Sequence, residues 1–340
     1  MAYKTQNSAP TSGLILEIQR MSTEDGPGLR TTVFFKGCSL ECAWCHNPES
    51  IHPYAEIQWI DSRCIGCRTC IDVCPENALS LMPDGMHINR DICTRCGVCT
   101  EECPSTAMEM LGQTWQLDDL VHEVLKDRVY FQKSDGGVTV SGGEPTLQGA
   151  FTAAFLERIK AEGISTALDT CGLCSRRHLE MILPQTDLVL FDLKTIDARL
   201  HQQLTGRTNQ KILDNLVHIA EWLKRHGSPH SLWIRTPIIP GATDTAANIT
   251  AIGKWIAAHV NRLTARWELC AFNNLCRDKY TRLGIVWPFR HTELLKQHQM
   301  VQLFETAKAS GLDPDIIRWS GPTKLEDPPQ QSTELRVVTA

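Results

Sequence analysis

The arrangement of the cysteines constrains this chain more than any other feature. Of 15 cysteines in 340 residues, eleven lie between Cys38 and Cys103, most of them two or three residues from the next. The N-terminal stretch 1–13 is polar and lacks the apolar run of a signal peptide. Cysteines packed so closely in a chain of this size, without an export signal, indicate metal binding or redox chemistry rather than a disulfide scaffold.

Eight of these cysteines form two copies of one pattern, C-x2-C-x2-C-x3-C-P, about 29 residues apart. In two-cluster ferredoxins, thiolates in such runs bind iron–sulfur clusters, and the fourth cysteine of each run ligates the other cluster. A repeat this short cannot bury its own core and needs something to fold around. Two zinc sites are the alternative, because zinc also binds paired cysteines. We predict two 4Fe-4S clusters, one on Cys64, Cys67, Cys70 and Cys103 and the other on Cys93, Cys96, Cys99 and Cys74.

The remaining three cysteines of the group, Cys38, Cys42 and Cys45, have the spacing C-x3-C-x2-C, and His46-Asn47-Pro48 follows them. Three thiolates on a four-iron cluster leave one iron open to a substrate or cofactor, as a catalytic metal site keeps a vacant position. Trp44 is placed to shield such a cluster or to pack against a bound ring. The motif directly follows a predicted strand at 31–37, so it lies at the carboxyl end of that strand.

Outside the cysteine-rich segment 63–104, apolar β-branched runs alternate with amphipathic helical patterns. Six or more βα units in series predict a parallel sheet covered by helices, either barrel-like or doubly wound, with the chemistry at the carboxyl ends of the strands. Strands are expected at 31–37, 137–143, 165–170, 187–194, 231–239, 267–272 and 315–319. Helices are expected at 117–128, 147–163, 175–183, 196–204, 210–226, 245–260 and 292–310.

The net charge of −5 and the pI near 6.2 give no reason to expect nucleic-acid or membrane-surface binding. No apolar run approaches the roughly 18 residues that a membrane span needs. We therefore expect a cytoplasmic protein.

The spacing C-x3-C-x-aromatic-C resembles the signature of the radical S-adenosylmethionine (SAM) superfamily, and "SGGEP" at 141–145 resembles its glycine-rich motif. The resemblance implies a cluster whose open iron is chelated by SAM and whose electron cleaves SAM to methionine and a 5′-deoxyadenosyl radical. Gly142 and Gly143 would let the backbone approach the ligand closely, and Glu144 would accept from its ammonium group. An ordinary strand-to-helix turn is the alternative interpretation of these three residues.

Further blocks resemble the glycyl radical enzyme activating enzymes of that superfamily. They read "EDGPGLRTTVFFKGC" (24–38), "CAWCHNPES" (42–50), "GGVTVSGGEPTLQ" (136–148), "TALDTCG" (166–172), "LFDLK" (190–194), "HQQLTGRTNQKILDNL" (201–216) and "WIRTPIIPGATD" (233–244). The resemblance implies an α/β fold, a partial (β/α)6 TIM-like barrel with an inserted bacterial ferredoxin-like domain. The implied boundaries are 1–51 and 111–325 for the barrel, 52–110 for the insert and 326–340 for a loose C-terminal tail.

The resemblance also implies roles for single residues. Lys194 and Arg235 face the SAM carboxylate, Asn47 lies near SAM, and Asp169, Thr170 and Asp192 hold a monovalent cation. Strand-end capping by the two aspartates and surface ion pairing by the two cations are the alternatives. The loop Asp25–Gly28 resembles one near the partner's glycine.

Two features depart from the family's pattern or lie outside it. Relatives often read "ELLPYH" where this chain reads "ELCAFNN" (268–274), so Asn273 takes the place of a histidine near the SAM nucleoside. Asparagine donates and accepts hydrogen bonds but does not become protonated. Cys171 and Cys174 form a C-x2-C pair, for which we expect a buried packing role rather than redox exchange.

The expected function is hydrogen abstraction from a backbone glycine of a partner glycyl radical enzyme. The expected cofactors are three 4Fe-4S clusters and SAM, with a flavodoxin- or ferredoxin-type electron donor and a monomeric chain. One alternative is a radical SAM enzyme that acts on a small molecule or another peptide. A multi-cluster electron carrier without enzymatic activity is the other.

Overall fold

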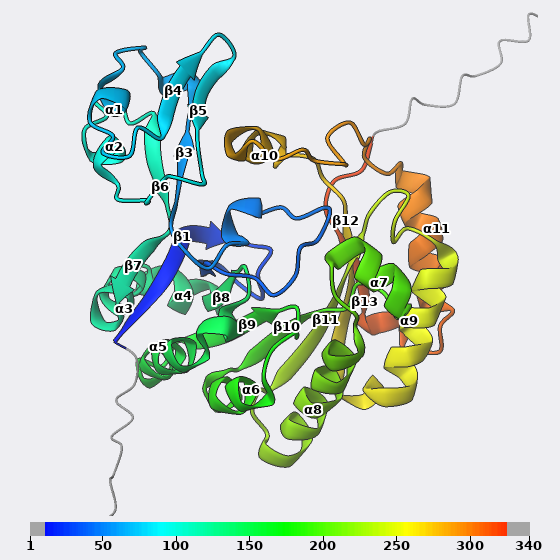
Figure 1. Ribbon diagram of the computed structural model, residues 1–340. Coiled ribbons are helices and arrows are strands. Elements are labelled where there is room, and N and C mark those ends of the chain that lie inside the picture. The colour runs from blue at the N-terminus through cyan, green and yellow to red at the C-terminus, as the bar shows by residue number, and fades with distance from the viewer. Residues whose placement is uncertain (1–10, 325–340) are drawn as a thin grey trace, which may run out of the picture.

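The computed structural model describes residues 11–324, and a single nine-stranded sheet organises the larger part of it (Figure 1). The strands follow the order β13-β12-β11-β10-β9-β8-β2-β1-β7, and all neighbours from β13 to β2 are parallel. The strands are β1 (Ser12–Ser22), β2 (Arg30–Phe35), β7 (Gln113–Gln116), β8 (Gly137–Gly142), β9 (Ser165–Thr170), β10 (Leu188–Asp192), β11 (Ser231–Ile238), β12 (Thr264–Ala271) and β13 (Ile317–Ser320).

Helices connect the parallel strands in chain order. Each crossover returns the chain to the same end of the sheet, as parallel pairing requires. Because β13 and β7 are its two edges, the sheet is an open partial barrel, and the predicted α/β fold is confirmed. The helices are α3 (Leu117–Leu125), α4 (Arg128–Ser134), α5 (Gly149–Ala161), α6 (Arg176–Ile182), α7 (Ala198–Thr205), α8 (Gln210–His226), α9 (Ala246–His259), α10 (Arg277–Leu283) and α11 (Gln297–Lys308).

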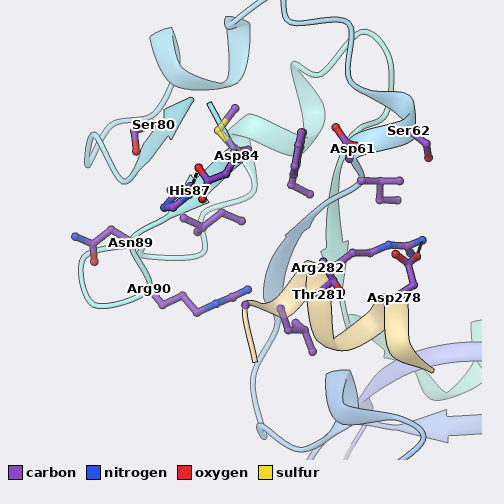
Figure 2. Close-up of a pocket in the computed structure, with 16 residues that line it drawn as sticks. Asp61, Ser62, Ser80, Asp84, His87, Asn89, Arg90, Asp278, Thr281 and Arg282 are labelled. Atoms are coloured by element: carbon purple, nitrogen blue, oxygen red, sulfur yellow. Dashed lines mark hydrogen bonds and ion pairs between the residues drawn. The ribbon is translucent and has the colours of Figure 1, made fainter. Parts of the chain in front are cut away.

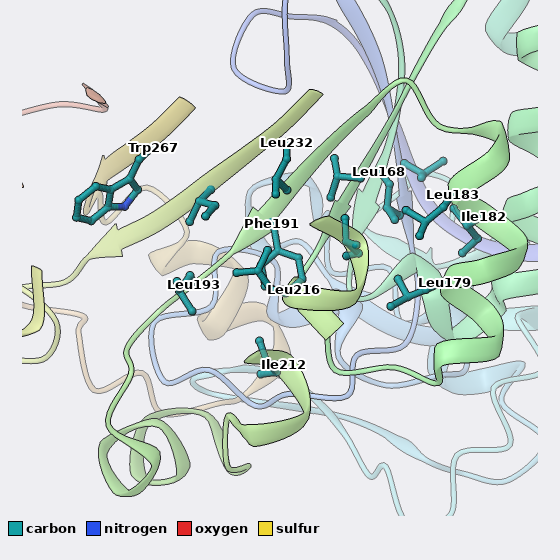
Figure 3. Close-up of a cluster of buried hydrophobic side chains, with 14 of the residues drawn as sticks. Leu168, Leu179, Ile182, Leu183, Phe191, Leu193, Ile212, Leu216, Leu232 and Trp267 are labelled. Carbon is teal, nitrogen blue, oxygen red and sulfur yellow. The ribbon is translucent and has the colours of Figure 1, made fainter. Parts of the chain in front are cut away.

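The main core lies between the sheet and the helices that cover it. Strands β9 to β11 are rich in buried aliphatic side chains, as expected for parallel strands covered on a face. Figure 3 shows side chains from these strands, including Leu168, Phe191 and Leu232, close to Leu179 of α6 and Leu216 of α8. This packing fixes the carboxyl ends of the strands, where the predicted site residues lie.

Residues 52–111 leave and rejoin the barrel through a pair of antiparallel strands, β3 (Glu56–Trp59) and β6 (Met108–Leu111). Beyond this pair lie a small hairpin, β4 (Leu79–Met82) with β5 (Gly85–Ile88), and two one-turn helices, α1 (Thr69–Asp72) and α2 (Val98–Glu101). Figure 1 shows this segment, hereafter the insert, projecting from one end of the sheet.

A buried ion pair joins the insert to the barrel. Lys36 follows β2, and its Nζ lies 2.9 Å from Oε2 of Glu56 at the start of β3. The Lys36 side chain is fully buried, and burial lowers its pKa while Glu56 opposes that shift. Arg90 of the insert adds a second contact to Glu56, at 3.7 Å. The pair therefore ties the two parts together one residue before the three-cysteine loop begins.

The predicted strands and helices correspond to observed elements, with a few differences. The helix expected at 117–128 is α3, which ends at Leu125, and α4, which begins at Arg128, was not predicted. The antiparallel strands β1 and β7 and the short helix α10 were not predicted. The tail predicted at 326–340 lies outside the described residues. Within residues 11–324, no helix is long and apolar enough to cross a membrane.

Candidate active site

A cavity of about 600 Å3 opens at the carboxyl ends of the parallel strands. Every parallel strand or the loop directly after it contributes to its wall, as expected for an α/β barrel. Its lining includes all three cysteines of the loop after β2, together with Trp44, Asn47, Gly142, Gly143, Asp169, Thr170, Asp192, Lys194, Arg235 and Asn273. The fold thus gathers residues predicted from motifs up to 235 positions apart.

The loop after β2, residues 37–51 and hereafter the cluster loop, is closed at its base by backbone hydrogen bonds. The amide of Gly37 donates to the carbonyl of Ser50 at 2.7 Å, and that of Cys38 donates to Ile51 at 2.9 Å. Burial raises the pKa of Cys42 to about 11 and also raises that of Cys45. Thiolates buried here need a nearby positive charge, and cluster iron supplies one. The donor set therefore fits an iron–sulfur cluster.

The last glycine of β8 and the glycine that follows it are required by backbone packing. Gly142 has φ +109°, and a Cβ at this position would lie 2.4 Å from the amide nitrogen of Phe35. A Cβ on Gly143 would lie 2.2 Å from the carbonyl oxygen of Gly37. The glycines therefore let the turn pack against the base of the cluster loop, and both residues still line the cavity.

Glu144 does not line the cavity in the way the motif suggested. Its side chain is fully buried, and its carboxylate accepts hydrogen bonds from Thr146, from the Thr170 hydroxyl and from the Cys171 amide. Donors of the chain itself thus satisfy this carboxylate. Glu144 ties the end of β8 to the end of β9 in this structure, and its predicted contact with a ligand ammonium group stays a prediction.

Asp169 and Arg235 face each other across the cavity wall. Asp169 accepts from the Ser141 hydroxyl at 2.6 Å and lies 3.7 Å from the Arg235 guanidinium. Burial raises the pKa of Asp169 to about 7; Arg235 counteracts this shift and Asp192 adds to it. The Arg235 Nε is buried and has no hydrogen-bond partner within residues 11–324. The Arg235 side chain is still 19% exposed and lines the cavity, so its guanidinium is suited to a ligand carboxylate.

Lys194 and Asp192 form a second charged pair in the cavity. The Lys194 Nζ lies 2.7 Å from the Asp192 carboxylate, and the lysine side chain is 6% exposed. Burial lowers the pKa of Lys194, but the negative charges of Asp192, Cys42 and Cys171 raise it by more than burial lowers it. The net pKa is therefore raised, and the amine stays charged. The cavity therefore holds two cations and two aspartates next to three thiols.

The other predicted contacts also reach the cavity. Trp44 is 6% exposed and packs in an aromatic cluster with Phe272, Tyr280 and Trp287. The backbone carbonyl of Asn273, rather than its side chain, makes a 2.9 Å contact with the ring of His46.

Cys171 and Cys174 are both buried, in keeping with the packing role expected for them. Cys171 also lines the cavity. Its thiol lies 3.8 Å from the Ser39 hydroxyl. A hydrogen bond from Cys171 lowers the pKa of Cys38. The sequence offered only a C-x2-C spacing as a signal, and the fold is needed to bring Cys171 beside the first cysteine of the loop.

The insert brings its eight cysteines together as two sets. Cys64, Cys67, Cys70 and Cys103 line one small cavity, and Cys74, Cys93, Cys96 and Cys99 line another. In each set three thiols come from one run and the fourth comes from the other run. Within residues 11–324, no three His, Cys, Asp or Glu side chains are arranged to hold a metal ion. The cluster assignments therefore stay predictions.

A second large cavity, of about 680 Å3, lies between the insert and α10 (Figure 2). Asp61, Arg90 and neighbouring insert residues line one side, and Asp278, Thr281 and Arg282 of α10 line the other. It contains no cysteine and none of the residues predicted to bind SAM.

Comparison with known proteins agrees with this geometry. The radical SAM superfamily model matches residues 32–250. The (2S)-3-sulfopropanediol dehydratase activating enzyme of Klebsiella oxytoca is 35% identical over 85% of this chain and 90% of that protein. The isethionate sulfite-lyase activating enzyme of Desulfovibrio desulfuricans is 37% identical, over 84% and 90%. The benzylsuccinate synthase activating enzyme of Thauera aromatica is also 37% identical, over 88% and 91%.

Fold, cavity and sequence matches together define an enzyme of the radical SAM superfamily, to which the chain belongs. Such an enzyme uses a 4Fe-4S cluster and SAM. Within the superfamily it belongs with the activating enzymes, and the resemblance to glycyl radical enzyme activating enzymes is confirmed.

Proposed function

We propose that the chain cleaves SAM reductively and removes one hydrogen atom from a backbone glycine of a partner glycyl radical enzyme. The products are methionine, 5′-deoxyadenosine and the glycyl radical on the partner. The observation that supports this most is the single cavity that collects Cys38, Cys42 and Cys45 with Lys194 and Arg235. When bound, the cluster supplies the one electron that breaks the sulfur–carbon bond of SAM.

The residues of the cavity have separate tasks in this proposal. Arg235 and Lys194 hold the SAM carboxylate, and the position of both cations in the cavity wall supports the assignment. Trp44 and Phe272 exclude water from the wall beside the cluster loop. Gly142 and Gly143 leave backbone atoms at the cavity surface, and Asn47 and Asn273 supply polar side chains there.

Asp169, Thr170 and Asp192 are proposed to hold a monovalent cation. Asp192 strengthens the upward shift in the pKa of Asp169, which shows that the two carboxylates repel each other. Thr170 lines the same wall and offers an oxygen. A bound cation would relieve this repulsion and favour the ionised pair.

The insert is proposed to be a ferredoxin-like domain, residues 52–110, with one 4Fe-4S cluster in each of its two cysteine cavities. The exchange of the fourth cysteine between the runs supports clusters of the two-cluster ferredoxin type over two zinc sites. The domain would relay electrons from a flavodoxin- or ferredoxin-type donor to the cluster loop. We propose that the chain does this as a monomer.

Two other functions were considered. An electron carrier has no use for a cavity that holds Lys194 and Arg235 beside three thiols. A radical SAM enzyme for a small molecule would share this cavity, but the curated relatives described above are activating enzymes. These relatives serve different partners, so the proposal names the class of partner and not one substrate.

The test is anaerobic incubation of the reconstituted full-length protein with SAM and dithionite. We expect 5′-deoxyadenosine and, with a partner glycyl radical enzyme added, a glycyl radical signal in electron paramagnetic resonance. Absence of 5′-deoxyadenosine would refute the proposal. R235Q should weaken SAM binding about tenfold. The matched variant R266Q should not, because Arg266 stacks on Trp233 away from the cavity.

A further inference from the structure

Helix α10 and the turn after it contact the cluster loop from outside the barrel. The Tyr280 hydroxyl donates to the Cys45 carbonyl at 2.8 Å, and the Trp287 indole donates to the Ala43 carbonyl at 3.1 Å. The two rings stack on each other at a centroid distance of 5.0 Å. These bonds hold the backbone on both sides of Trp44. The third cysteine is therefore positioned by a segment more than 230 residues away.

Lys279, on the same helix, contacts the side chain of Asn47. Its Nζ lies 2.8 Å from the Asn47 Oδ1 and 2.5 Å from the Glu49 carboxylate. An ammonium group can only donate hydrogen bonds, so the amide oxygen of Asn47 has to face Lys279. The Asn47 Nδ2 is then turned away from Lys279, and it has no hydrogen-bond partner in the described part of the chain. Asn47 lines the cavity, so its free donor is available to a bound molecule.

We propose that Lys279 is a positioning residue that orients the Asn47 amide as a hydrogen-bond donor to an acceptor atom of bound SAM, while Tyr280 fixes the adjacent Cys45. This inference rests on the proposed function, because it needs SAM in the cavity. Lys279 itself does not line the cavity and acts through Asn47. Without Lys279, the amide is free to rotate and to present its oxygen, which an acceptor atom of SAM would repel.

A simpler role for Lys279 is to neutralise Glu49, whose side chain is only 10% exposed. The two roles predict different results for K279M in an E49Q background. If Lys279 serves only Glu49, the lysine is not needed there, and E49Q/K279M binds SAM as E49Q does. If Lys279 orients Asn47, E49Q alone leaves the contact to the amide in place and SAM binds as before, whereas E49Q/K279M binds SAM about tenfold more weakly.

The side of α10 that lines the cavity shared with the insert provides a matched control. Arg282 lies one turn from Lys279, is paired with Asp278, and lines the cavity shared with the insert (Figure 2). R282M therefore makes the same kind of change as K279M, a cation to methionine, on the same helix but away from the cluster loop.

The experiment is equilibrium dialysis of SAM against the anaerobically reconstituted full-length protein, with iron content as the check on loading. We expect K279M and N47A each to weaken SAM binding about tenfold. The double variant K279M/N47A should bind within about twofold of N47A alone, because both changes remove one interaction. R282M and E49Q should stay within about twofold of the wild type.

The outcomes distinguish a failure of the proposed function from a failure of the orienting role of Lys279. If the wild-type protein does not bind SAM, the proposed function fails and this inference falls with it. If the wild type binds SAM but the losses of K279M and N47A add in the double variant, the orienting role is wrong. K279R keeps the donor, so it should restore most of the affinity, and a failure to do so with normal iron content would equally overturn the proposal.

Discussion

The eight cysteines of the insert lie within residues 64–103, whereas the cluster loop is held by partners as far as 244 positions away in sequence. The insert gathers its thiols through two local runs that face each other. The cluster loop takes its cysteines from one short segment and its support from α10 and the ends of β8 to β12. Local repetition suffices to bring eight thiols together in two sets. The cavity beside the cluster loop instead takes its lining from every parallel strand of the barrel.

The largest effect is expected when a cysteine of the cluster loop is replaced while the cysteines of the insert are left intact. C45A should abolish 5′-deoxyadenosine formation, by at least about a thousandfold, since the cluster would lose one of only three thiolates. Iron content should fall by about four per chain, while the insert clusters remain. Iron analysis and the SAM cleavage assay measure both effects, and retained cleavage would contradict the assignment.

The junction between the two regions can be broken at its buried ion pair. E56Q leaves the buried Lys36 without its main counter-charge and should lower the free energy of unfolding by about 3 kcal/mol. K36M should cost less, because Glu56 keeps Arg90 at 3.7 Å. Denaturant unfolding of both variants measures the two losses of stability. A larger loss for K36M than for E56Q would contradict this prediction, because it would show that Arg90 does not replace Lys36 as the partner of Glu56.

A smaller effect should follow from damage to the insert alone. C67A removes a predicted ligand of one insert cluster and should slow SAM cleavage about tenfold when a ferredoxin or flavodoxin supplies the electrons. C45A serves as the comparison, because it should stop cleavage with any reductant. A normal rate for C67A, or for C96A in the other set, would refute the electron relay.

The smallest effect concerns pH and appears only in the cavity. The pKa of Asp169 is raised by burial to about 7, so protons compete with a cation below this pH. K+ should therefore improve SAM affinity several-fold more at pH 8 than at pH 6. D169N should remove the difference, and the spectra of the insert clusters should not change with K+. A K+ effect that is equal at both pH values would remove Asp169 from the cation site.

Much of the fold was predictable because the parallel strands are continuous apolar runs. Strand β1 was missed because much of it is half-buried and it carries polar residues between its apolar ones. Helix α10 was missed for a similar reason, because only Tyr280 and Leu283 of its seven residues are buried. Two buried residues give no helical period in a window of the usual length.

The site residues that belong to a sequence motif were predictable. The contacts that depend on the tertiary structure were not. The spacing of the cysteines and the positions of Lys194 and Arg235 correctly indicated residues of one cavity. The motif could not show that the Glu144 carboxylate is satisfied by Thr146, Thr170 and Cys171. Nor could it show the hydrogen bond of Tyr280 to Cys45, because nothing in the sequence relates positions so far apart.

The pairing of Glu56 with Leu111 places the entrance and the exit of the insert side by side. A segment attached in this way can be inserted or deleted in one step, with little disturbance of the strands on either side. Removal of the insert would take Glu56 away and leave the buried Lys36 without its carboxylate partner. We expect a shortened chain, in which a tight turn replaces residues 52–111, to need an uncharged residue at position 36. The same substitution would prepare the barrel to accept a different module.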